Sequence, residues 1–134
     1  MHSSFTEIVG SELRRAERYS IFVSLGVMDL SSARKGSNGG DQDNLLSLLQ
    51  VVKKNIRDVD SVSFINGSKL GLLFPETPRQ GAEKVVKRIA EIVRQHLIET
   101  GTFQASGDII PLEMASYPDA AGAKTITEIL QEWS

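Results

Sequence analysis

The stretch from Ser61 to Thr77 constrains the fold most, because it has the pattern of a β-hairpin. Two runs of alternating apolar and polar residues flank the dipeptide Asn66-Gly67. Asn-Gly at such a position is a strong hairpin signal, since a type I′ turn needs a positive φ at both central residues. The sequence therefore predicts an antiparallel hairpin with Asn66-Gly67 at its tip. The apolar positions of its two strands are Val62, Phe64, Leu70, Leu72 and Phe74.

Apolar residues at helical spacing predict four helices around this hairpin. Capping-box sequences open the first helix at Ser4 to Glu7 and the last at Thr125 to Glu128. The second helix is expected to have Asp41 or Asp43 as its N-cap, and the third is expected to start near Pro78. The predicted ranges are 4–18, 44–59, 78–99 and 125–133.

Two further segments have the character of strands. Residues 19–30 are β-branched and apolar on both faces, which is typical of a central strand. Residues 101–118 are expected to form one or two strands, with Pro111 marking an edge or a bulge. The Gly- and Ser-rich residues 31–43 predict a flexible connector. The order of these elements predicts an α/β (α+β) fold of ferredoxin-like type, in which helices flank a mainly antiparallel sheet.

The composition narrows the class of protein. A net charge of −2 argues against a nucleic-acid partner, and the lack of cysteine excludes disulfides, thiolate nucleophiles and Cys-based metal sites. The longest nearly apolar stretch, residues 21–28, is too short to span a bilayer, and the first residues do not resemble a signal peptide. We therefore expect a single domain over residues 1–134, in the cytoplasm and without membrane insertion.

Few residues suggest catalysis directly. His2 and His96 are the only histidines, so neither a Ser-His-acid set nor a His-rich metal site is expected. His96 lies near the end of the third predicted helix, where a surface or helix-terminal role is expected. The segment GSNGGD at 36–41 lacks the Gly-Lys-Ser/Thr ending of a Walker A loop.

Three charged residues near the ends of elements carry more information. Asp29 ends the predicted central strand, where an acid serves as a helix cap, a solvated group or a metal ligand. Arg57 and Asp60 lie between a helix and a strand. A guanidinium beside a carboxylate can read a guanine base, or it can form an ordinary surface salt bridge. Both interpretations of this pair remain open from the residues alone.

Four segments, in this order, resemble the GGDEF family, the diguanylate cyclase domains that join two GTP molecules into cyclic di-GMP. Residues 11–30 resemble the family's first helix and strand, and residues 56–77 resemble its RxxD motif followed by the signature hairpin. Residues 81–93 resemble the next helix, and residues 110–120 resemble the late strand that ends in Tyr-Pro. The resemblance covers nearly the whole chain and implies a nucleotide-cyclase fold in a bacterial signalling protein.

The resemblance also implies that the catalytic machinery is incomplete. The Gly-Gly-Asp/Glu-Glu-Phe signature falls on Asn66-Gly67-Ser68-Lys69-Leu70, so Ser68 and Lys69 replace the acidic pair that binds Mg²⁺. Asp29 matches the family's first metal-binding Asp, but Ser31 stands where a second acid is expected. The guanine-reading segment is missing, which leaves Asp41 as its remnant.

We therefore expect a pseudo-diguanylate cyclase without catalytic residues, a productive Mg²⁺ site or another cofactor. Its vestigial active site would consist of Asp29, Asn66, Gly67, Ser68 and Lys69.

The resemblance extends to the product-binding inhibitory site of the family. Arg57 and Asp60 match the RxxD motif, and Arg88 matches the Arg of the following helix. The resemblance implies that Arg57 and Arg88 contact guanine edges and phosphates of cyclic di-GMP, while Asp60 accepts from a guanine N–H. The alternative is that all three are ordinary helix-end and surface charges inherited with the fold.

Three functions remain for comparison. The first is an inactive GGDEF-like regulatory domain that binds cyclic di-GMP. The second is a nucleotide-independent interaction or dimerisation module of a signalling protein, and the third is an unusual active cyclase or other nucleotide enzyme. Other signalling domains or proteins are the expected partners, a homodimer is one expected arrangement, and residues 1–18 are where an upstream domain would connect.

Overall fold

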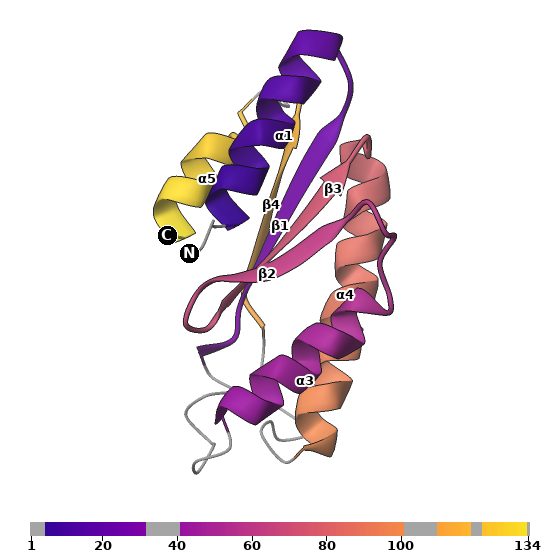
Figure 1. Ribbon diagram of the computed structural model, residues 1–134, viewed down its shortest axis with the longest axis vertical. Coiled ribbons are helices and arrows are strands. Elements are labelled where there is room, and N and C mark those ends of the chain that lie inside the picture. Colours follow the sequence, from indigo (N-terminus) through magenta and orange to yellow (C-terminus); the bar gives the residue numbers. More distant parts are fainter. Residues whose placement is uncertain (1–4, 32–40, 101–109, 119–121, 134) are drawn as a thin grey trace.

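The computed structural model describes residues 5–31, 41–100, 110–118 and 122–133, without the side chains of residues 41–45. The elements of this described part are α1 (Phe5–Tyr19), β1 (Val23–Asp29), α3 (Asp41–Lys53), β2 (Ser61–Asn66), β3 (Lys69–Pro75), α4 (Arg79–Glu99), β4 (Leu112–Tyr117) and α5 (Ile126–Trp133). They form three layers, with α1 and α5 on one face of the sheet and α3 and α4 on the other (Figure 1).

The described strands pair in the order β2-β3-β1-β4, and each of these pairings is antiparallel. The chain passes from β1 through α3 to the β2–β3 hairpin and through α4 to β4, which is a ferredoxin-like arrangement. The predicted α+β fold class is therefore confirmed.

β1 is a central strand because both of its faces carry apolar side chains. Met28 joins the core under α3 and α4, whereas Val23, Leu25 and Val27 join the core under α1 and α5. Full burial of one large aliphatic side chain is worth roughly 1.5–3 kcal/mol, so a strand buried on both faces is held firmly in the middle of the sheet. The strand is shorter than the predicted 19–30, since α1 continues to Tyr19.

The predicted apolar stripe of α4 is confirmed. The helix starts after Pro78 and ends at Glu99, as its spacing predicts. Five of its residues are buried in the core beneath α3 and α4, namely Ala82, Val86, Ile89, Val93 and Leu97. On the opposite face, α1 approaches β3 closely at Gly71, where a Cβ atom would overlap the ring of Phe5.

The second helix is shorter than predicted, because α3 spans Asp41–Lys53 rather than 44–59. Asn55 ends it: its backbone N–H donates to Val52 O at 2.9 Å and its side-chain amide donates to Val51 O at 2.8 Å. These bonds take up carbonyls that a longer helix would use. The prediction failed because Ile56 continues the apolar spacing although it packs against the core from beyond the helix.

The hairpin is confirmed, but its turn lies one residue later than predicted. Asn66 pairs with Lys69, so Gly67-Ser68 form the tip, and the pairing skips Ile65. In this described hairpin, residues 66–69 lack the left-handed φ that a type I′ turn needs, so that turn type was wrong. A register irregularity such as the one at Ile65 shifts the tip without disturbing the apolar alternation from which the turn was predicted.

The capping box at the start of α5 is confirmed. Thr125 N–H donates to Glu128 Oε1 at 2.8 Å, and Glu128 N–H donates to Thr125 Oγ1 at 3.1 Å. β4 lies at one edge of the described sheet and follows Pro111, as predicted.

Other predictions fall on residues that are not described. Ser4, residues 32–40 and residues 101–109 lie outside the described part of the chain. Helix α3 begins at Asp41, but the structure does not describe the side chains of Asp41 and Asp43. The predicted N-cap of this helix therefore stays a prediction.

Candidate functional site

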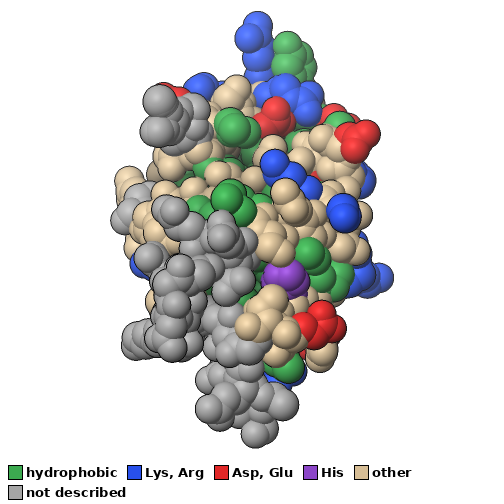
Figure 2. All heavy atoms as spheres, turned by 60° about the horizontal axis from the view of Figure 1, so that its bottom comes forward, with side chains coloured by type: hydrophobic (Ala, Val, Ile, Leu, Met, Phe, Trp, Pro, Cys, Tyr) green, Lys and Arg blue, Asp and Glu red, His purple; other side chains and the backbone are tan. Residues whose placement is uncertain are grey.

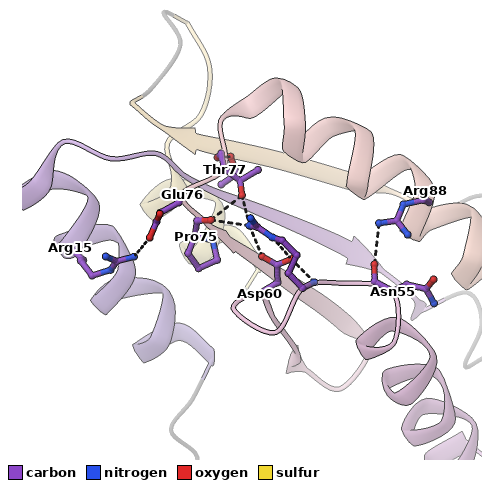
Figure 3. A network of polar contacts seen from close by, with 9 residues as sticks. Arg15, Asn55, Asp60, Pro75, Glu76, Thr77 and Arg88 are labelled. Carbon is purple, nitrogen blue, oxygen red and sulfur yellow. Dashed lines mark hydrogen bonds and ion pairs between the residues drawn. The ribbon is translucent and has the colours of Figure 1, made fainter.

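The turn between α3 and β2 holds Arg57 against Asp60 (Figure 3). Asp60 Oδ2 accepts from the Arg57 backbone N–H at 2.9 Å and from Nε at 3.2 Å, and Oδ1 accepts from Nη2 at 2.9 Å. This two-point contact is the geometry that charge-assisted guanidinium–carboxylate pairs favour. The Asp60 side chain is 3% exposed and that of Arg57 is 55% exposed. The carboxylate is therefore committed to Arg57, and the cation faces solvent.

The segment between β3 and α4 supplies two more acceptors to Arg57. Arg57 Nη2 donates to Pro75 O at 3.0 Å and to Thr77 Oγ1 at 2.6 Å. The hydrogen bond to Asp60 raises the pKa of Arg57, so the guanidinium keeps its charge. Within the described part of the chain the side-chain contacts of Arg57 run through Nε and Nη2. The two hydrogens of Nη1 are thus available to a ligand.

Arg88 on α4 closes the same turn from the other side. Its Nη2 donates to Asn55 O at 3.1 Å (Figure 3). Arg57, Asp60 and Arg88 line one pocket of about 490 Å³, to which Lys54 adds a further cation. The structure therefore brings the three predicted binding residues together, in a pocket with more positive than negative side chains.

Asp29 lies at the opposite end of the strands, in the predicted vestigial active site. Ser31 N–H donates to Asp29 Oδ1 at 2.9 Å, so this carboxylate caps the residues that follow β1. Lys69 stands opposite Asp29 in the β1–β3 pairing. No group of three His, Cys, Asp or Glu side chains converges within the residues described. The side chain of Asp41 is not among them.

The hairpin tip is attached to Trp133 at the end of α5. Asn66 Nδ2 donates to Trp133 O at 3.1 Å, and Lys69 Nζ lies 5.6 Å from the centroid of the indole ring. Trp133 Nε1 donates to Glu113 Oε1 at 2.8 Å. The bond from Trp133 lowers the pKa of Glu113. A hydrogen bond from Lys124 lowers this pKa further, whereas partial burial of the carboxylate acts to raise it. Ser68 contributes its carbonyl, which accepts from Leu30 N–H at 2.8 Å.

Sequence reasoning did not identify Thr77, Asn55 or Trp133 as partners of the two sites. Thr77 lies far along the chain from Arg57, and its hydroxyl meets the guanidinium only because β3 returns beside the turn. A local signal existed for Asn55 alone, since Asn is frequent where helices end. His96 was placed correctly: it lies in the last turn of α4, with Nε2 3.2 Å from Ser47 Oγ.

Charged side chains of both signs are interspersed on the face of the molecule that Figure 2 shows. Among the described helices, none combines the length and the apolar character needed to cross a lipid bilayer.

The chain is an α+β domain whose fold matches that of solved cyclase domains. No family sequence model matches the chain, and no curated protein matches it in sequence. Solved structures do match it. They include a diguanylate cyclase protein from Thermotoga maritima, with a TM-score of 0.66, 17% identity and coverage of 96% of this chain and 90% of that one.

Two further matches belong to the same group. The active GGEEF domain of a diguanylate cyclase from Vibrio cholerae gives a TM-score of 0.62 at 19% identity, covering 92% of this chain and 78% of that one. The GGDEF domain of DgcB from Caulobacter crescentus, solved in complex with c-di-GMP, gives 0.58 at 13% identity, covering 84% and 68%. The chain thus has the fold of GGDEF domains, as its motifs predict.

Proposed function

We propose that the chain is a catalytically inactive GGDEF-like regulatory domain that binds cyclic di-GMP at Arg57, Asp60 and Arg88. The observation that carries this proposal is the pocket of about 490 Å³ that these three residues line together. The likeness in fold to a GGDEF domain solved in complex with c-di-GMP supports the choice of ligand.

The pocket suits the chemistry of a cyclic dinucleotide. The two phosphodiester groups of such a ligand are anions. In the pocket, Arg57, Arg88 and Lys54 supply cations with several N–H donors. Arg57 can use Nη1 for this contact without giving up Asp60. Asp60 orients the guanidinium in this arrangement. Acceptance from a guanine N–H by Asp60, as the family resemblance implies, would require its pair with Arg57 to open.

The proposed loss of catalysis rests on the hairpin tip. Lys69 places a cation opposite Asp29, where phosphoryl transfer to a nucleotide needs a divalent metal. Ser68 and Ser31 replace two further acids of the family pattern, and a hydroxyl is a much weaker ligand for Mg²⁺ than a carboxylate. Incubation with GTP and Mg²⁺ followed by chromatography is expected to give no cyclic di-GMP. Product formation that Asp29→Ala abolishes would overturn this part of the proposal.

Titration calorimetry with cyclic di-GMP tests the binding site. We expect the parent to bind and Arg57→Ala or Arg88→Ala to weaken binding at least about tenfold, since each removes a charge-assisted contact. Lys87→Ala is the matched control, because Lys87 precedes Arg88 on α4 but does not line this pocket. Absence of heat from the parent at high micromolar ligand would refute the receptor function. Equal weakening by Lys87→Ala would refute the site.

One observation favours a protein-interaction function as the second candidate. Six large apolar side chains of the described part of the chain are exposed, among them Tyr19 at 61%, Phe22 at 49% and Val59 at 62%. Phe22 and Val59 both neighbour Glu76: Glu76 N–H donates to Phe22 O at 2.8 Å, and Val59 lines a hollow with Glu76. A chain that binds no cyclic di-GMP but self-associates in light scattering, and becomes monomeric with Val59→Asp, would favour this second function.

A further inference from the structure

Thr77 contacts Arg57 through its hydroxyl, in the short segment that joins β3 to α4 (Figure 3). The hydroxyl carries one hydrogen, which it donates to Pro75 O at 2.9 Å. Its lone pairs are then left to accept, and Arg57 Nη2 donates to them at 2.6 Å. Nη2 also donates to Pro75 O at 3.0 Å and to Asp60 Oδ1 at 2.9 Å, so one of its two hydrogens is shared between two acceptors. The Thr77 hydroxyl thus links the two acceptors: it bonds to Pro75 O, and both Pro75 O and Thr77 Oγ1 accept from Arg57 Nη2.

The backbone of Thr77 is fixed from within the core. Ser24 Oγ donates to Thr77 O at 2.8 Å, and its oxygen lies 2.8 Å from Ser116 Oγ. Ser24 is wholly buried on β1, and Ser116 is 6% exposed on the neighbouring β4. Because Ser24 spends its hydrogen on Thr77, Ser116 is the donor within the pair. A chain of hydroxyls therefore runs from the edge strand through β1 to the segment that holds Arg57.

Glu76, which lies between Pro75 and Thr77, is also held in place by hydrogen bonds. Glu76 has a φ of 55°, in the left-handed region that L-residues rarely adopt. Its N–H donates to Phe22 O at 2.8 Å, and its carboxylate accepts from Arg15 Nη2 on α1 at 3.1 Å. Such a conformation persists only where the surroundings determine it, which indicates that the segment has one defined geometry.

We infer that Thr77 is a positioning residue for Arg57, and that the buried Ser24–Ser116 pair sets the place of Thr77. This inference rests on the proposed function, because it concerns how the ligand-binding guanidinium is oriented. Thr77 and Asp60 between them fix Nη2 and Nε, so Nη1 meets the ligand in a preset direction. A side chain ordered before binding loses less conformational entropy when the ligand arrives.

The test uses Thr77→Val, which keeps the shape of the side chain and removes the hydroxyl, and Thr77→Ser, which restores the hydroxyl. Thr127→Val is the matched control, because Thr127 is an exposed residue of α5. We expect Thr77→Val to weaken cyclic di-GMP binding about tenfold, the loss of one hydrogen bond to a charged group, and Thr77→Ser to stay close to the parent.

A second measurement needs no ligand. The Arg57 Nε–Hε resonance, assigned by its absence in Arg57→Lys, is expected to exchange slowly in the parent and in Thr77→Ser. It is expected to exchange about tenfold faster in Thr77→Val, since one of the bonds that hold the guanidinium is gone. Ser24→Ala is expected to speed the exchange of this hydrogen as well, while the amide resonances of the sheet remain those of the folded chain.

The two measurements separate the two proposals. If the parent does not bind cyclic di-GMP, the proposed function fails, and the Arg57 resonance still decides the role of Thr77. If the resonance and its exchange are the same in Thr77→Val as in the parent, Thr77 does not position Arg57, whatever the ligand result. Equal weakening of binding by Thr77→Ser and Thr77→Val would also overturn the inference.

Discussion

Lys69 stands directly opposite Asp29 in the antiparallel pairing of β3 with β1. Directly opposed residues of an antiparallel pair have Cβ atoms roughly 4.5–5.5 Å apart, so the two side chains act on the same small volume. Asp29 also accepts from Ser31 N–H, and the Lys69 ammonium lies near the Trp133 ring. A cationic residue of the chain itself therefore occupies the register position opposite the carboxylate at the end of β1.

The first prediction concerns metal binding at this pair. Replacing Lys69 by Glu puts a carboxylate opposite Asp29, so the site should attract a divalent cation. We expect Lys69→Glu to bind Mn²⁺ at least about tenfold more tightly than the parent, given the size of unit-charge interactions near a protein surface. Paramagnetic broadening of the amide resonances around Asp29 measures this binding.

Lys84→Glu is the control for the first prediction. It makes the same change of net charge at an exposed position of α4, in a different layer from the hairpin tip. Broadening that is equal in the parent and in Lys69→Glu would mean that Lys69 does not decide the metal affinity of this edge.

The second prediction concerns the buried carboxylate of the candidate pocket. Asp60→Asn removes the charge from a group that is 3% exposed and accepts three hydrogen bonds from Arg57. We expect the free energy of unfolding to fall by about 1–3 kcal/mol, as measured by urea denaturation. Asp58→Asn in the same exposed turn is expected to change it by less than about 0.5 kcal/mol. Similar losses from both variants would contradict the assigned role of Asp60.

Much of the fold could be predicted because its signals are local. The two-faced apolar pattern of β1 and the stripe of α4 each follow from which residues must be buried. The end of α3 could not be predicted, because Ile56 keeps the helical spacing while Asn55 takes the carbonyls of Val51 and Val52. Periodicity reports burial, and burial continues past the end of a helix.

The candidate site was predictable in part for the same reason. Arg57 and Asp60 form a contact within one turn, so their spacing carried the information. Arg88 was found through its match to the family pattern. The partners Thr77 and Trp133 come from distant parts of the chain, and only the pairing of strands brings them to Arg57 and to the hairpin tip. No local pattern marks such a contact.

The third prediction tests the close approach of α1 to the sheet. A Cβ at Gly71 would overlap the Phe5 ring, so Gly71→Ala forces the ring or the helix to move. Overpacking of this kind typically costs roughly 1–3 kcal/mol. Gly10→Ala lies within α1, where a Cβ meets only Arg14 Nη1 at 3.4 Å, and should stabilise the chain by about 0.5–1 kcal/mol. Thermal unfolding measures both variants, and we expect a lower Tm for Gly71→Ala and a higher Tm for Gly10→Ala. A stabilised Gly71→Ala would show that α1 does not pack as described.

The fourth prediction concerns the pH dependence of the bond between Glu113 on β4 and Trp133, the residue to which the hairpin tip is attached. The bond from Trp133 lowers the pKa of Glu113 below its ordinary value of 4.5. A group whose pKa is lowered by folding stabilises the native state above its unfolded pKa, and this contribution disappears as the pH falls through the folded pKa. We therefore expect Glu113 to add stability above about pH 4.5 and to lose that contribution in more acidic solution.

Trp133 is the single tryptophan of the chain, so its fluorescence reports on this attachment directly. In Glu113→Gln the side-chain carbonyl still accepts from the indole, while the charge that pairs with Lys124 is lost. At neutral pH we expect the variant to be less stable than the parent by about 0.5–1 kcal/mol, and the difference should shrink as the pH falls below 4.5. Glu17→Gln, on the exposed face of α1, should give no such difference. A parent–variant gap that stayed constant through the acid range would mean that the charge of Glu113 does not contribute to the stability of the chain.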